Sequence, residues 1–162
     1  MPILVYINGS INSGKSTVGS LLAKNLPGTV HIEVDELRQF ADCLSLAEAC
    51  PYCLEDAATL ARNWLSRGFN VVVTWPISHC DYAVFERVAA DAGVSIYAFT
   101  LRPALEVAMS DRDQRQLTER ERARIREQYR SSHIDPGIGT VIDNSDQTPA
   151  ETLATVRATL GV

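Results

Sequence analysis

Eight consecutive residues near the N-terminus, Gly9 to Ser16, follow the pattern G-x-x-x-x-G-K-S/T in full. Glycines in such a loop let the backbone approach phosphate oxygens, while its N–H groups turn inward. The lysine reaches the terminal phosphates, and the hydroxyl of the last residue can bind Mg²⁺. The alternative is a glycine-rich turn with a surface lysine. The pattern predicts a nucleoside triphosphate site, with Lys15 catalytic and contacts from Gly9, Ser10, Asn12, Ser13, Gly14, Lys15, Ser16 and Thr17.

Two carboxylates, Glu33 and Asp35, lie at the end of the next apolar segment. Strand alternation places both on one face, with Asp35 nearer the site. A carboxylate there can bind Mg²⁺ or accept a proton from an attacking hydroxyl. We expect Asp35 to act as base and, with Ser16, as metal ligand, and both Asp35 and Arg38 to contact the substrate. The alternatives are a helix N-cap for Asp35, a solvated Arg38, and an arginine partner for Glu33.

The arginines are concentrated in one segment. Eight of the 13 lie between Arg102 and Arg130, where six acids leave a net charge of +2, against −7 for the rest of the chain. Arginine binds phosphate through a planar fork of donors and stays charged. Arg112 and Arg115 interrupt the apolar pattern, and we expect them in a lid at about residues 111–118, contacting the transferred phosphoryl group. The arginines from 120 to 130 alternate with glutamates, which is typical of a solvated helix face.

The remaining pattern predicts how these residues are positioned. Apolar runs and turn residues predict strands over 3–7, 29–34, 70–75, 94–101 and 139–142, and helices over 15–26, 54–67, 81–92 and 149–160, with an interrupted helical stretch over 102–130. Thr118 and Glu121 have the spacing of a capping box. Strands that alternate with helices predict a parallel sheet covered on both faces, with the site at the carboxyl ends of the strands.

Composition narrows the class of protein. A chain of 162 residues with 46% hydrophobic and 22% charged residues is typical of one globular domain, which we place over residues 1–162. No apolar run approaches the roughly 20 residues that span a bilayer. The N-terminus lacks the basic region of a signal peptide, and four cysteines without such a signal predict reduced thiols and a cytoplasmic protein. The net charge of −5 disfavours nucleic acid as a partner.

Four segments together resemble the P-loop small-molecule kinases, which include shikimate kinase-like and antibiotic phosphotransferase-like enzymes. These segments are the loop at Gly9–Ser16, the Glu33-Val34-Asp35 segment with Arg38, the arginine-rich segment and the late Val141–Ser145. The resemblance implies a three-layer α/β fold with a five-stranded parallel sheet and a helical lid, and ATP and Mg²⁺ as cofactors. It also implies that Asp143, Asn144 and Ser145 border the adenine, with Asn144 contacting the nucleotide. Unlike most shikimate kinases, this chain has no glycine triplet after its third strand.

The acceptor and the cysteines leave more alternatives open. We expect Trp75 and His79, together with Tyr52 and Tyr82, to line the acceptor pocket, although Trp75 also fits the core and His79 an exposed loop. The Cys50-Pro51-Tyr52-Cys53 segment resembles a glutaredoxin redox site, but no strand precedes it. A zinc site with Cys43 and Cys80 lacks a standard spacing. We interpret the four cysteines as structural thiols.

These observations favour an ATP-dependent phosphotransferase that acts on a hydroxyl of a small molecule. Its expected partner is that acceptor, without membrane or nucleic acid, in a monomer or a homodimer. The main alternative is a regulatory or switch NTPase without an acceptor. A redox protein that uses Cys50 is a third possibility.

Overall fold

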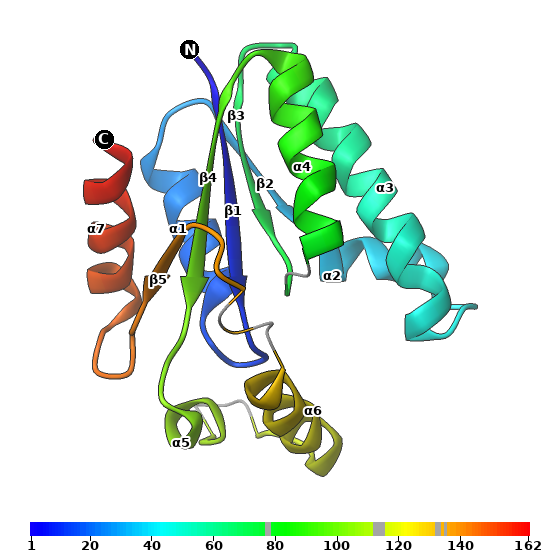
Figure 1. Ribbon diagram of the computed structural model, residues 1–162, viewed down its shortest axis with the longest axis vertical. Coiled ribbons are helices and arrows are strands. Elements are labelled where there is room, and N and C mark those ends of the chain that lie inside the picture. Colours follow the sequence, from blue (N-terminus) through cyan, green and yellow to red (C-terminus); the bar gives the residue numbers. More distant parts are fainter. Residues whose placement is uncertain (77–78, 112–115, 132–133, 135) are drawn as a thin grey trace.

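The computed structural model describes residues 1–162 except 77–78, 112–115, 132–133 and 135, and the side chain of residue 79. Its centre is one five-stranded, all-parallel sheet in the order β2-β3-β1-β4-β5 (Figure 1). The strands are β1 (Ile3–Gly9), β2 (Thr29–Glu33), β3 (Asn70–Thr74), β4 (Ser95–Leu101) and β5 (Thr140–Ile142). This sheet agrees with the five strands expected from the sequence.

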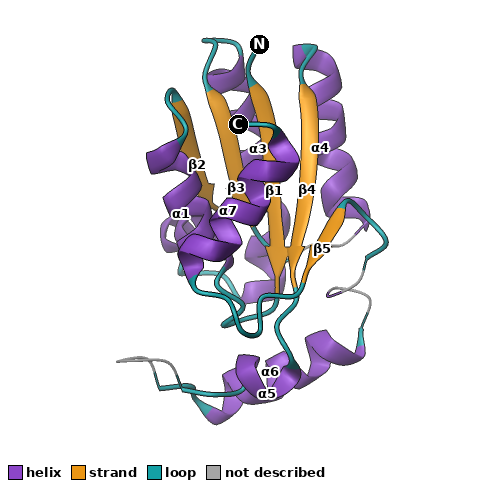
Figure 2. Cartoon of the chain, turned by 90° about the vertical axis from the view of Figure 1, so that its left-hand side faces the viewer, coloured by secondary structure: helices purple, strands orange, loops and turns teal. Residues whose placement is uncertain are grey.

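Helices cover both faces of the sheet. On one face lie α1 (Lys15–Asn25) and α7 (Pro149–Leu160), and on the other α3 (Leu46–Leu65) and α4 (His79–Ala92) (Figure 1). Two short elements, α2 (Val34–Leu37) and η1 (Arg38–Ala41), connect β2 to α3. Beyond the carboxyl ends of the strands lie α5 (Leu105–Ala108) and α6 (Glu119–Arg130) (Figure 2). No helix among the described residues is long and apolar enough to cross a membrane.

Side-chain alternation along the strands divides the core into two layers. In β1, Leu4 and Tyr6 pack towards α3 and α4, whereas Val5 and Ile7 pack towards α1 and α7, and all four are fully buried. A strand that is buried on both faces must be apolar throughout, which is why this run lacks a polar alternation. A third, smaller cluster joins α5 and α6 beyond the strand ends.

The structure confirms the capping signals of the sequence. Thr118 accepts a hydrogen bond from the backbone of Glu121, whose carboxylate accepts one in return, and α6 begins there. Pro149 is at the start of α7 as expected. A further capping box, at Ser45 and Glu48, begins α3 eight residues before the predicted helix start at residue 54.

Two other predicted boundaries were wrong. The interrupted helical stretch expected over 102–130 is confirmed as α5 and α6, but it begins at Leu105, because residues 102–104 are irregular. The strand predicted over 29–34 ends at Glu33, since the buried Val34 already begins α2.

Candidate nucleotide and acceptor site

The loop between β1 and α1 turns at the carboxyl edge of the sheet. Asn12 and Gly14 have positive φ angles of 64° and 93°, and they flank Ser13, whose φ is not positive. Such an alternation turns successive N–H groups to one side and creates an anion-binding concavity. A Cβ atom on Gly9 would lie 2.2 Å from the Ser13 Oγ, so the loop closes only around a glycine. This is the geometry that the motif predicts.

The start of α1 adds donors to this concavity. The first helical hydrogen bond runs from the Val18 N–H to the Gly14 carbonyl at 2.9 Å, so the N–H groups of residues 15–17 precede the helical ladder. Lys15 is buried, with the residue 7% exposed, whereas Ser16 and Thr17 are exposed. The helix end, the buried ammonium and the exposed hydroxyls together favour an anionic ligand.

Other residues expected to contact the nucleotide have structural partners. Asn144 donates from Nδ2 to the Ser13 carbonyl at 3.0 Å and is itself buried. Asn12 donates from Nδ2 to the carbonyls of Ala108 and Ser110 at 3.0 and 2.9 Å. Ser10 donates from Oγ to the Ile11 carbonyl at 3.0 Å. The side chains of Asn12 and Asn144 hold the loop in place.

The acidic segment differs from the strand that was expected. Asp35 lies in the first turn of α2 and is exposed, so it does not share a strand face with Glu33. Glu33, which the sequence left with a structural alternative, has both carboxylate oxygens buried with no hydrogen-bond partner among the described residues. A buried, unpaired carboxylate is costly, and such a group requires an explanation.

Helix α1 packs on the face of β2 that carries Glu33. A Cβ atom on Gly19 would lie 2.8 Å from Nε2 of His31, so helix and strand are in direct contact there. Glu33 is two residues further along the same strand face, and Ser16 is one turn nearer the start of α1. Because α1 runs back from the edge at which β2 ends, Glu33 and Ser16 both lie towards that edge.

The residues expected on the acceptor side are distributed over α2, η1, α3 and α4. Burial raises the pKa of the Cys50 thiol on α3. Asp35, exposed in the first turn of α2, and the half-buried Arg38, at the start of η1, both follow the carboxyl end of β2. Tyr82 is buried nearby against Tyr6, with the two ring centres 5.9 Å apart.

Other predicted acceptor residues have different positions. Trp75 is buried in the core layer under α3 and α4, which agrees with the packing alternative. Tyr52 is exposed on α3. His79 begins α4, but its side chain lies outside the described part of the chain. Arg112 and Arg115 also lie outside the described residues.

The cysteine segment is helical and does not follow a strand. Cys50 and Cys53 are both within α3, and burial raises the pKa of each thiol. A reactive cysteine requires a lowered pKa, because the thiolate is the nucleophile. The environment of both residues therefore supports the structural interpretation over the redox one.

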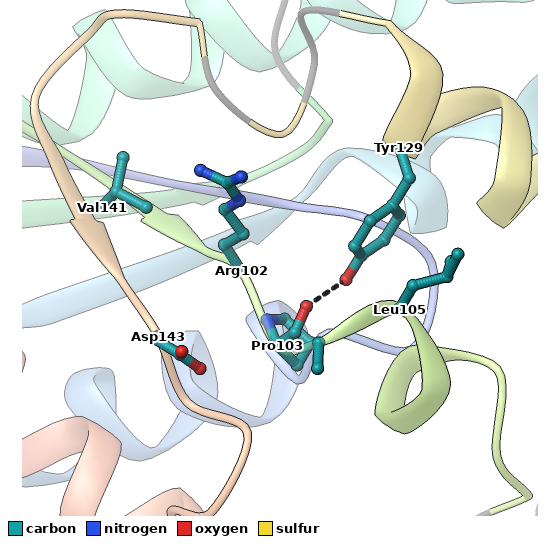
Figure 3. Close-up of a pocket in the computed structure, with 7 residues that line it drawn as sticks. Arg102, Pro103, Leu105, Tyr129, Val141 and Asp143 are labelled. Carbon is teal, nitrogen blue, oxygen red and sulfur yellow. Dashed lines mark hydrogen bonds between the residues drawn. The ribbon is translucent and has the colours of Figure 1, made fainter.

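A cavity of about 460 Å³ opens between the end of β4 and the loop after β5 (Figure 3). The Tyr129 hydroxyl donates to the Pro103 carbonyl at 2.5 Å, and the Ser145 hydroxyl accepts from the Ala104 N–H at 2.8 Å. Hydrogen bonds from the Ser145 hydroxyl and backbone hold the pKa of Asp143 below its usual value. The lining residues are Arg102, Pro103, Ala104, Leu105, Tyr129, Val141 and Asp143.

Most of these lining residues were not identified from the sequence. Arg102 and Pro103 directly follow a strand, where the carboxyl-end rule points to function. Tyr129, in contrast, is at the far end of α6, and nothing in its local sequence indicates a cavity 26 residues away.

Comparison with known proteins supports this architecture. No curated protein is significantly similar in sequence. The tunicamycin resistance protein of Deinococcus radiodurans is 21% identical, with a TM-score of 0.69 over 100% of this chain and 97% of that one. APS kinase of Mycobacterium tuberculosis, in complex with AMPPNP and APS, is 20% identical, with a TM-score of 0.68 over 99% and 98%. Shikimate kinase of Aquifex aeolicus is 19% identical, with a TM-score of 0.62 over 98% and 96%.

The family match covers most of the chain. Residues 4–133, which include the loop, the acidic segment and α6, match the family described as an AAA domain, AAA_33. The structural likenesses extend from end to end of the chain and show its fold. This chain belongs to the AAA-domain family AAA_33 and has the fold of the P-loop small-molecule kinases.

Proposed function

We propose that this protein is an ATP-dependent phosphotransferase that moves the γ-phosphoryl group to a hydroxyl of a small molecule. The observation that carries the proposal is the complete phosphate loop, with the buried Lys15, at the sheet edge where β2 ends and Asp35 follows. Phosphoryl transfer requires positioning and charge stabilisation, and this edge offers both. The similar structures named as kinases support the same reaction class.

The cavity at Arg102 supports a site for the adenine ring. It lies between the segment after β4 and the loop after β5, whose Asn144 is bonded to the phosphate loop. Aliphatic and aromatic walls with a few polar groups are typical of such sites. In this arrangement, the cavity holds the base while residues 14–17 hold the phosphates.

The residues at the edge of α1 fit Mg²⁺. The Glu33 carboxylate, which has no partner among the described residues, offers the oxygen ligands that this ion prefers, and Ser16 is exposed at the start of α1. Asp35, in the first turn of α2, is the third proposed ligand. When bound, the ion would neutralise phosphate charge. Glu33 therefore joins Ser16 and Asp35 as a proposed ligand.

The charges of the remaining side chains suggest their roles in catalysis. Asp35 accepts the proton of the acceptor hydroxyl, and Arg38 binds the acceptor beside it. Lys15 stabilises the charge that develops on the transferred group, with Arg112 and Arg115 of the lid as its partners.

The test is acceptor-dependent release of ADP at saturating MgATP, across panels of sugars, nucleosides, antibiotics and other alcohols. We expect one class to stimulate release, and Lys15→Met to reduce the stimulated rate by about 100-fold or more. Asp35→Asn is expected to abolish stimulation but to retain nucleotide binding. Slow ATP hydrolysis that no acceptor changes would instead support the switch NTPase.

A further inference from the structure

Two residues of the phosphate loop are bonded to α5 and α6. The Ile11 N–H donates to Oε1 of Gln128 at 3.0 Å, across 117 residues of sequence. The Asn12 amide donates to the carbonyls of Ala108 and Ser110, at the end of α5. We call these three hydrogen bonds the loop clasp. They join the middle of the loop to a unit that lies beyond the strand ends (Figure 2).

The bond between Ile11 and Gln128 lies beside an apolar cluster. Gln128 is 5% exposed, and Ile125 on the same helix is fully buried. Ile11 itself packs against the cluster of Ala108, Leu117 and Ile125, which is separate from the two main core layers. A hydrogen bond in such surroundings is strong, and an acceptor left without its donor there costs about 1–3 kcal/mol.

Asn12 adopts a conformation that few side chains tolerate. Its φ of 64° is the only positive value outside glycine among the residues that the structure describes. Glycine would adopt this conformation more readily, but it has no amide to donate. Asparagine tolerates the left-handed region better than most residues, so it meets both requirements.

Hydrogen bonds within the α5–α6 unit hold its two helices together. Asp111 accepts from the Leu117 N–H and from the Arg122 guanidinium, each at 2.9 Å. Arg122 also donates to the Met109 carbonyl. These bonds tie the end of α5 to α6, so a displacement of one helix displaces the other. The position of the whole unit relative to the loop then depends on Asn12 and Gln128.

We propose that Asn12 and Gln128 are positioning residues, which fix the α5–α6 unit in register with the phosphate loop for phosphoryl transfer. This inference rests on the proposed function. The donors expected to hold the phosphates belong to residues 14–17, whereas the clasp uses residues 11 and 12. Loss of the clasp is therefore expected to impair turnover far more than nucleotide binding.

The test compares kcat, the KM for ATP and the affinity for a fluorescent ADP analogue. We expect Gln128→Leu and Asn12→Gly each to lower kcat about tenfold or more, with KM and analogue affinity within about twofold of the parent. Gln128→Glu retains an acceptor of the same reach and is expected to recover most of the turnover. Arg126→Leu, an exposed change on α6, is the matched control and is expected to behave as the parent.

A second readout does not require turnover. Hydrogen exchange of residues 119–130 is expected to slow in the parent on addition of MgADP, and to remain unchanged in the double variant Asn12→Gly/Gln128→Leu. Asn12→Gly keeps the loop conformation accessible, so it remains informative if Gln128→Leu unfolds.

The outcomes separate the two proposals. Either of two results would overturn the positioning role alone. In the first, the parent binds MgADP but the hydrogen exchange of residues 119–130 does not change. In the second, the clasp variants keep the parental kcat. A failure of the parent to bind any nucleotide would overturn the proposed function and this inference together.

Discussion

At the residue scale, two side chains on the α1 face of β2 have unusual surroundings. Glu33 has both carboxylate oxygens buried without a partner among the described residues. His31, two residues earlier, shares a hydrogen bond of 2.9 Å between its Nε2 and the Thr74 Oγ1. Burial lowers the pKa of His31, while the nearby Glu33 and Glu36 act in the opposite direction. Both side chains lie where α1 meets the sheet, so their charge states affect the site and the fold.

Replacement of Glu33 by glutamine separates function from stability. Removal of an unpaired buried charge is expected to leave the free energy of unfolding unchanged or to raise it by about 1 kcal/mol. In the parent, Mg²⁺ added with ADP is expected to raise the Tm above that with ADP alone, and this difference is expected to vanish in Glu33→Gln. Thermal unfolding measures both effects. The exposed Glu36→Gln is the control, and an undiminished response to Mg²⁺ in Glu33→Gln would remove Glu33 from the metal site.

A pH dependence follows from His31. Its pKa is lower in the folded state than the ordinary 6.5, so above pH 6.5 it is neutral in both states and contributes no difference. As the pH falls below 6.5, the unfolded state takes up the proton first and the parent loses stability. His31→Gln, which keeps a hydrogen-bonding group, is expected to lose less between pH 7.5 and 5.5. Urea unfolding at both pH values measures this, and equal losses would contradict the direction of the shift.

At the element scale, α1 depends on a close approach to two strands. A Cβ atom on Gly19 would lie 2.6 Å from the Thr74 Cγ2 and 2.8 Å from the His31 Nε2. The helix therefore packs on β2 and β3 through a position without a side chain. This contact sets the depth at which the N-terminus of α1 meets the phosphate loop.

Gly19→Ala is expected to reverse the usual effect of this substitution. In a helix interior, alanine ordinarily gains about 0.5–1 kcal/mol over glycine. Overpacking costs about 1–3 kcal/mol, so we expect a net loss of roughly 1 kcal/mol and a lower Tm. The exposed Lys24→Ala on the same helix is the control. A stabilised Gly19→Ala protein would show that α1 can move away from the sheet without cost.

At the scale of the whole molecule, segments far apart in sequence hold the phosphate loop. Asn144, after β5, bonds to the Ser13 carbonyl across 131 residues, and Gln128 bonds to Ile11 from α6. The cavity at Arg102 lies between these two supports. The loop geometry is thus a property of the complete sheet and of the α5–α6 unit.

Asn144→Ala tests the first of these supports. The Ser13 carbonyl would lose its buried donor, which is expected to cost about 1–3 kcal/mol of unfolding free energy. Because the loop then loses a fixed point, we also expect weaker nucleotide binding, by about tenfold. Denaturant unfolding and titration with the fluorescent ADP analogue measure the two effects. The exposed Asp146→Ala, in the same loop, is the control, and unchanged affinity in Asn144→Ala would show that the loop needs no such support.

The sequence by itself determined the class of fold and the nucleotide loop. Apolar runs of strand length, amphipathic helices and capping pairs such as Thr118 and Glu121 depend on contacts within a few residues, so their patterns are visible locally. The spacing from Gly9 to Ser16 is equally local, because a phosphate loop is built from consecutive backbone N–H groups.

Tertiary structure alone decided which side chains surround that loop. The burial of Glu33 and the partners of Asn12 and Gln128 depend on how helices pack against the sheet, and no local pattern encodes contacts across about a hundred residues. The expected strand face shared by Glu33 and Asp35 was wrong because burial of Val34 turned the chain into α2 one residue earlier. Local propensity determined the elements, whereas packing determined which of their polar groups meet at the site.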